Sequence, residues 1–142
     1  MRILVLDAQG GGIGRQLIMA LREVLPQATI MAVGTNAIAT MAMLKAGADK
    51  AATGENAVLV ALRAADVVVG PIGIVIADAM MGEVTPPMAK AIGQFEGKRV
   101  LIPFQNCDSY IVGVQEKNTG ALVKEAVEII QGIAEETMEK KV

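Results

Sequence analysis

The sequence contains no histidine, and this absence removes several kinds of chemistry. Histidine is the usual general base near neutral pH, the central member of a Ser-His-Asp triad and the commonest ligand of catalytic zinc. A single cysteine, Cys107, excludes an intramolecular disulfide and a thiolate zinc cluster. We therefore expect no metal site and no histidine-based catalysis.

Aromatic residues are scarce as well, at 2% with no Trp, which leaves no stacking platform for single-stranded nucleic acid. The net charge of −2 gives no basic surface for nucleic acid or for anionic lipid. No apolar run approaches the roughly 18 residues that cross a bilayer, and the first apolar stretch is too short for a signal peptide. These features predict a cytoplasmic protein whose partners include neither nucleic acid nor membrane.

Apolar residues, by contrast, make up 53% of the 142 residues. This length fits one domain over residues 1–142 that can bury a core. The chain has more Met, Ala and Ile than a small core needs, which predicts a homo-oligomer whose copies cover the remaining apolar surface.

Short apolar runs alternate with stretches of helical periodicity along the chain. The run at residues 3–6 is continuous, as in a buried parallel strand, and residues 13–25 carry apolar side chains at helical spacing. Further strands are expected at 29–33, 50–52, 67–69 and 99–102, and further helices at 37–46, after the loop 53–56, from Thr85 and from about Thr119. This order predicts a Rossmann-like α/β fold, a doubly wound three-layer sandwich with a mostly parallel sheet in order 3-2-1-4-5.

Residues 110–114 are predicted to form a sixth strand. Only the seven residues 103–109 separate them from the fifth strand, whereas a parallel crossover needs about a dozen. The sixth strand is therefore expected to be antiparallel, at the edge of the sheet.

A glycine-rich loop follows the first strand, and its residues are candidates for holding a cofactor: Gln9, Gly10, Gly11, Gly12, Ile13 and Gly14. Glycines allow close approach to a phosphate, which the free amides and dipole of the next helix then hold. The pattern matches no standard motif, since Arg15 replaces the last glycine of G-x-G-x-x-G and no Gly-Lys-Ser/Thr follows. The alternative is a tight turn that only packs closely.

Two more loops are expected at the same edge of the sheet. Thr35 and Asn36 follow the second strand, where NAD-binding proteins usually carry an acidic residue that holds the ribose. Gly70, Pro71 and Ile72 follow the fourth strand and complete the candidate cofactor site. The choice between NAD, NADP and a mononucleotide is open. Another helix start, at residues 53–56, could take an anion, but ordinary capping explains Thr53 and Glu55 without a ligand.

Candidates for catalysis are few. Asp7 ends the first strand and could act as a base, with Asp78 and Glu83 as possible partners, or could simply cap nearby amides. Cys107 could be a nucleophile only if its pKa were lowered. Tyr110 has Val114 four residues later, so the Tyr-x-x-x-Lys pair of short-chain dehydrogenases is missing.

Several loop motifs carry a family resemblance: residues 7–14, 34–37, 53–57, 70–73 and 107–113. Over nearly its whole length the chain resembles a family of short bacterial proteins, mostly from anaerobic Gram-positive bacteria, described only as a domain of unknown function. The resemblance implies a cytoplasmic bacterial protein without an assigned activity, and it supplies no catalytic residues.

Three hypotheses follow. The first is a module that binds a nucleotide or dinucleotide, NAD(P) or another, without a complete catalytic apparatus. The second is a small enzyme whose site is completed across a homo-oligomer interface and uses Asp7, Asn106 or Cys107. The third is a structural protein that binds partners through its apolar surface.

Overall fold

A computed structural model describes residues 1–103, 109–115 and 117–142 of the chain. Its centre is a sheet of five strands: β1 (Arg2–Asp7), β2 (Thr29–Gly34), β3 (Lys50–Thr53), β4 (Val67–Pro71) and β5 (Lys98–Ile102). All neighbouring strands are parallel, and their order is β3-β2-β1-β4-β5. The predicted fold class and strand order are therefore confirmed.

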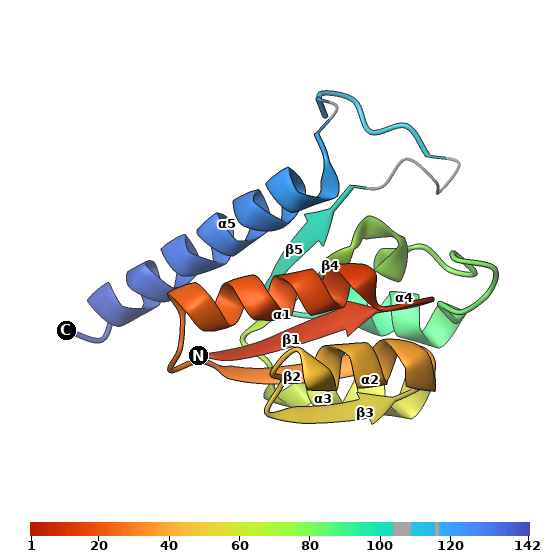
Figure 1. Ribbon diagram of the computed structural model, residues 1–142, viewed down its shortest axis with the longest axis horizontal. Helices are drawn as coiled ribbons and strands as arrows, with labels where there is room; N and C mark the ends of the chain where they lie inside the picture. The colour runs from red at the N-terminus through yellow and green to blue at the C-terminus, as the bar shows by residue number, and fades with distance from the viewer. Residues whose placement is uncertain (104–108, 116) are drawn as a thin grey trace.

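Helices cover both faces of this sheet (Figure 1). One face carries α1 (Gly12–Val24), α2 (Ala37–Lys45) and the long α5 (Thr119–Glu139). The other face carries α3 (Glu55–Ala64), the short 3-10 helix η1 (Ile72–Val75) and α4 (Pro86–Gly93). In the part of the chain that the structure describes, no helix combines the length and the apolar character needed to span a membrane.

The central strand β1 shows why an unbroken apolar run forms this sheet. Successive side chains of a strand point to opposite faces, so a strand covered on both faces must be apolar throughout. Ile3 and Val5 pack into the core beneath α1 and α5, while Leu4 and Leu6 pack into the core beneath α3 and α4. The run at residues 3–6 thus builds two cores at once.

The starts of three helices follow from capping side chains. Asn36, Thr85 and Asn118 each accept a hydrogen bond from an amide in the first turn of α2, α4 and α5. Helix α3 differs, because Gly54 precedes it and no side chain caps it. The expected capping role of Thr53 is therefore wrong: this residue ends β3, and its hydroxyl pairs with that of Thr40 at 2.7 Å.

The predicted sixth strand is also wrong. Within 109–115 the structure has no strand, and the sheet ends at β5. Gly113 has a positive φ of 87°, and the Val114 amide donates to the carbonyl of Ile111, so the chain turns here instead of extending. The side chains of Tyr110 and Val112 are both 99% exposed. The β-branched and aromatic composition of this segment is typical of a strand, but no core receives it.

Candidate functional site

Three loops converge at the carboxyl edge of the sheet, beside the point where the strand order reverses between β1 and β4. The Thr35 amide after β2 donates to the Asp7 carbonyl at the end of β1. The side-chain amide of Asn36 donates to the Gln9 carbonyl at 2.9 Å. Gly70 and Pro71, predicted to follow the fourth strand, instead form its end, and η1 begins directly after them at Ile72. In doubly wound sheets this crevice is where ligands bind.

Asp7 holds the start of α1 in place. Its side chain is buried, at 6% exposure. One carboxylate oxygen accepts from the Ala8 amide at 2.8 Å, and the other accepts from the Gly14 amide at 2.7 Å. Asp7 therefore has the geometry of the capping alternative, with both oxygens directed at the backbone of the loop.

Three of the candidate glycines are required by the fold itself. Gly11 has φ of 73°, and a Cβ there would lie 2.8 Å from the Cα of Ala39 in α2. A Cβ on Gly14 would collide with Met43, and one on Gly70 would collide with the Leu6 carbonyl. Gly11 and Gly14 allow α2 to approach the start of α1, and Gly70 allows β4 to lie close to β1, so packing alone accounts for these three glycines.

Gly10 and Gly12 are different. Neither has a positive φ, and a Cβ on either would have no atom within 4 Å among the described residues. Their amides donate to no acceptor in the part of the chain that the structure covers. Nothing in the fold therefore demands glycine at these two positions, and both amides are free to donate.

Glu83 joins the three loops at this edge. It follows the turn after η1, and one of its oxygens, Oε1, accepts three hydrogen bonds. The donors are the Gln9 amide at 2.9 Å, the Thr35 hydroxyl at 2.7 Å and the Asn36 side-chain amide at 2.7 Å. A carboxylate thus lies between the glycine-rich loop and the end of β2.

The two carboxylates at this edge have opposite pKa shifts. Partial burial works to raise the pKa of Glu83, but the three hydrogen bonds outweigh it and hold the pKa below its ordinary value. Burial raises the pKa of Asp7 above its ordinary value, against the amides of Gly14, Ala8 and Ile13, and the Glu83 charge adds to the rise. Glu83 is therefore firmly ionised at neutral pH.

The segment that carries Glu83 has an unusual backbone. Asp78, Met80 and Met81 have φ of 65°, 56° and 59°, and Gly82 has φ of 86°. Side chains other than glycine rarely adopt this region, and clusters of such residues occur where surrounding contacts hold them. The Asp78 amide donates to the Val84 carbonyl at 2.8 Å, which closes the turn. The turn brings Glu83, but not Asp78, to the glycine-rich loop.

The other candidate residues are placed as follows. Ile13 and Pro71 are buried, Ile72 is half-buried and Arg15 is exposed. Asn106 and Cys107 lie outside the described residues. No group of three or more His, Cys, Asp or Glu side chains in residues 1–103, 109–115 and 117–142 is arranged to hold a metal ion.

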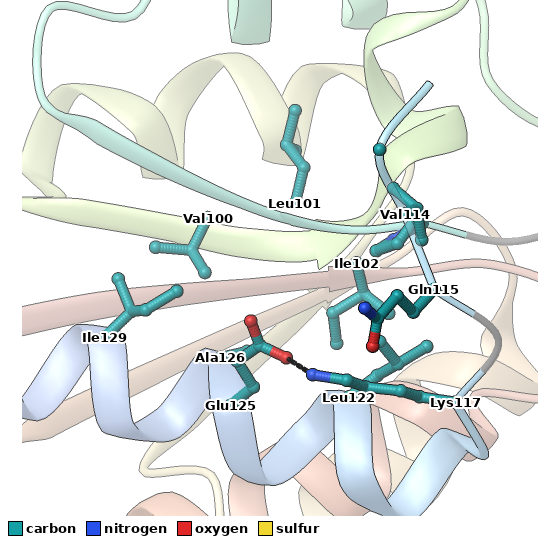
Figure 2. A pocket seen from close by; sticks show the side chains of 12 residues that line it. Val100, Leu101, Ile102, Val114, Gln115, Lys117, Leu122, Glu125, Ala126 and Ile129 are labelled. Carbon is teal, nitrogen blue, oxygen red and sulfur yellow. Dashed lines mark hydrogen bonds and ion pairs between the residues drawn. The ribbon is translucent and has the colours of Figure 1, made fainter. Parts of the chain in front are cut away.

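A small cavity lies beneath the candidate edge. The cavity that touches Asp7 and Thr35 has a volume of about 10 Å³. A much larger cavity, about 350 Å³, lies between β5, α5 and residues 113–115 and 117 (Figure 2). Val100, Ile102 and Ile129 line it, and the ion pair of Lys117 and Glu125, 2.8 Å long, lies at its rim. None of the predicted cofactor-binding residues lines this larger cavity.

The fold and the loop cluster define an α/β protein of the doubly wound class. Within that class, the chain belongs to the family described as Domain of unknown function (DUF3842), whose model matches residues 2–135. The resemblance stated from the loop motifs is therefore confirmed. A comparison with curated proteins found no match.

The solved structures that are similar to this chain include the following two. One is a dodecameric FMN-dependent UbiX-like decarboxylase from Escherichia coli O157:H7, with 18% identity, 93% of this chain and 76% of that chain covered, and a TM-score of 0.45. The other is AibC, with 19% identity, a TM-score of 0.48, and coverage of 92% of this chain and 38% of that chain.

Sequence reasoning named Glu83 only as a partner of Asp7 and missed its contacts with Thr35 and Asn36. Those contacts depend on the turn at residues 78–82, in which three non-glycine residues have positive φ. No propensity predicts such a turn. One feature of the sequence could have pointed to Glu83: no acidic residue follows the second strand, so a carboxylate at this edge has to come from another loop.

Proposed function

We propose that this protein is a nucleotide- or dinucleotide-binding module whose ligand lies across the carboxyl ends of β1, β2 and β4. The residues that would contact the ligand are Gln9 to Gly14, Thr35, Asn36, and Gly70 to Ile72. The proposed ligand is NAD(P) or another nucleotide such as FMN. The module has no complete catalytic apparatus of its own.

The observation that carries this proposal is the environment of Gly10 and Gly12. A Cβ on either residue would meet no atom within 4 Å, and neither residue has a positive φ. Both amides lack an acceptor among the described residues. Glycine at these two positions leaves the backbone open to close approach by a ligand. Amides at the start of α1 favour an anionic ligand group such as a phosphate.

The alternative hypothesis, an enzyme completed across an oligomer interface, uses Asp7, Asn106 or Cys107, and only Asp7 of these lies within the described residues. Asp7 is buried and both of its oxygens accept backbone amides, a geometry suited to holding the loop. For Asp7, this geometry favours a structural role over a catalytic one.

Self-association belongs to the same proposal. Tyr110 and Val112 are fully exposed on the segment beside β5, and Ile38 and Met41 are exposed on α2. Exposed apolar groups gathered on a small domain favour association with other copies. We propose a cytoplasmic homo-oligomer, formed by one domain over residues 1–142, that binds a small nucleotide-like molecule rather than nucleic acid or membrane.

Thermal-shift screening tests the ligand proposal. NAD(H), NADP(H), FMN and adenine nucleotides are added at concentrations well above an ordinary dissociation constant. A ligand that binds the native state raises the melting temperature with its concentration. Stabilisation by at least one of these compounds is expected, and no stabilisation by any of them would overturn the proposal.

A further inference from the structure

We infer that Glu83 makes the end of β2 a site for a ligand's vicinal hydroxyl pair, the unphosphorylated ribose of a nucleotide, and excludes a phosphate from that place. This inference rests on the proposed function and deepens it, because it names the ligand group that lies beside Thr35 and Asn36.

The placement of the carboxylate is the first argument. A carboxylate after β2 is what grips ribose hydroxyls in doubly wound folds, and β2 here ends in Thr35 and Asn36 instead. Both residues donate to Glu83 Oε1, at 2.7 Å each, so they hold the carboxylate at the end of β2. A residue from beyond η1 thereby supplies the acid that β2 itself lacks.

The free acceptor is the second argument. Oε1 accepts all three hydrogen bonds of Glu83, and Oε2 has no partner among the residues that the structure describes. Glu83 is only half-buried, so this second oxygen can accept from a molecule that approaches from solvent. Hydroxyl groups can donate to it, whereas an ionised phosphate cannot.

The local charge is the third argument. Asp7 and Glu83 are close enough that the charge of Glu83 contributes to the raised pKa of Asp7. A ligand phosphate at the end of β2 would meet the negative charge of Glu83 directly, and like charges at short range repel. Gly10 and Gly12, whose amides are free, are the positions where the ligand's phosphate groups find donors.

NAD and NADP form a suitable pair of probes, because they differ only by a phosphate on one ribose hydroxyl. Dissociation constants are measured by titration calorimetry for the wild-type chain, for Glu83→Gln and for the control Glu128→Gln. The control removes the same charge from an exposed position on α5. Glutamine keeps an acceptor for the three donors, so Glu83→Gln is expected to fold.

The wild type is expected to bind NAD about tenfold or more tightly than NADP. This ratio corresponds to the free energy lost with one charge-assisted hydrogen bond. Glu83→Gln is expected to bring the two affinities within about threefold, and Glu128→Gln to keep the wild-type ratio. Equal affinities in the wild type, or an unchanged ratio in Glu83→Gln, would overturn the inference.

Two other outcomes are also decisive. Tighter binding of both compounds to Glu83→Gln would mean that Glu83 obstructs the site instead of selecting the ligand, which contradicts the inference. Binding of neither compound to the wild type would contradict it too. The proposed function would then still be judged separately, by the response to FMN and adenine nucleotides in the thermal-shift screen.

Discussion

Glu83 and Asn36 are 47 residues apart in the chain, yet Glu83 Oε1 accepts a hydrogen bond from Asn36 Nδ2 at 2.7 Å. This contact fastens the turn after η1 to the start of α2, where Asn36 is also the N-cap. It joins loops from both halves of the doubly wound sheet. The predictions below test what this edge of the sheet does for stability and for binding.

The charge of Glu83 is expected to stabilise the fold near neutral pH. Because hydrogen bonds hold its pKa below the ordinary value, its contribution is present above the unfolded-state pKa and is lost as the pH falls through the folded-state pKa. Glu83→Gln is expected to lower the free energy of unfolding by about 1 kcal/mol or less at about pH 7. Urea unfolding should show this gap closing by about pH 3, and a gap independent of pH would contradict the account.

Asp7→Asn is expected to destabilise the protein, even though burial raises the pKa of Asp7. The two carboxylate oxygens accept separate amides, from Ala8 and Gly14, and asparagine has only one oxygen to offer. Its NH2 group would face a backbone N–H, which costs about 1–3 kcal/mol. Urea unfolding measures the loss. Unchanged stability would mean that Asp7 does not hold the start of α1.

The contribution of Asp7 to stability also depends on pH, and its dependence has the opposite sign to that of Glu83. A raised folded-state pKa means that the contribution of Asp7 is fully present below its unfolded-state pKa and is lost as the pH rises through the folded-state value. The Asp7→Asn variant is expected to lack this decline. In the same urea series, its free energy of unfolding should therefore fall less than that of the wild type above about pH 4.

Gly11→Ala is expected to be much more destabilising than Gly10→Ala. At Gly11 the positive φ and the backbone of Ala39, 2.8 Å from an added Cβ, both oppose a side chain, with a cost of at least about 1–3 kcal/mol. At Gly10 the added methyl meets nothing within 4 Å, and a change within about 0.5 kcal/mol is expected. Similar melting temperatures for the two variants would contradict the assignment of fold-required and free glycines.

The exposed side chains beside β5 are expected to drive self-association. Replacing Tyr110 and Val112 by serine removes two fully exposed apolar groups without touching the core. Light scattering should show a smaller assembly for this double variant than for the wild type, while the circular dichroism spectrum stays unchanged. The same change at Ile38 and Met41 tests separately whether the exposed apolar surface of α2 takes part in the assembly. If the assembly of the double variant has the same mass as that of the wild type, Tyr110 and Val112 do not drive self-association.

The sequence predicted the sheet well because each buried strand is marked locally. The run at residues 3–6 can only be a strand covered on both faces, and Thr85 with Pro86 marks the start of a helix. Strand order then follows from short, right-handed connections between parallel strands. The prediction of a sixth strand at residues 110–114 was wrong, because a composition typical of strands does not guarantee a neighbouring strand to pair with.

The candidate site was harder to predict, for a physical reason. The distinction between Gly11 and Gly12 depends on how closely α2 approaches the loop, and this distance is set by tertiary packing. The role of Glu83 depends on a turn that three non-glycine residues form with positive φ. Neither feature leaves a periodic pattern in the sequence.

The central claim, that a ligand anion lies against the free amides of Gly10 and Gly12, is tested most directly by Gly12→Glu. A carboxylate in the first turn of α1 suits the helix dipole, so stability should be maintained or rise by about 0.3–1 kcal/mol. Gly120→Glu, in the first turn of α5, makes the same change of charge away from the site. Calorimetric titration with whichever nucleotide stabilises the wild type is expected to show binding to Gly120→Glu and a loss of at least about tenfold in affinity for Gly12→Glu. Equal affinity in both variants would contradict the account.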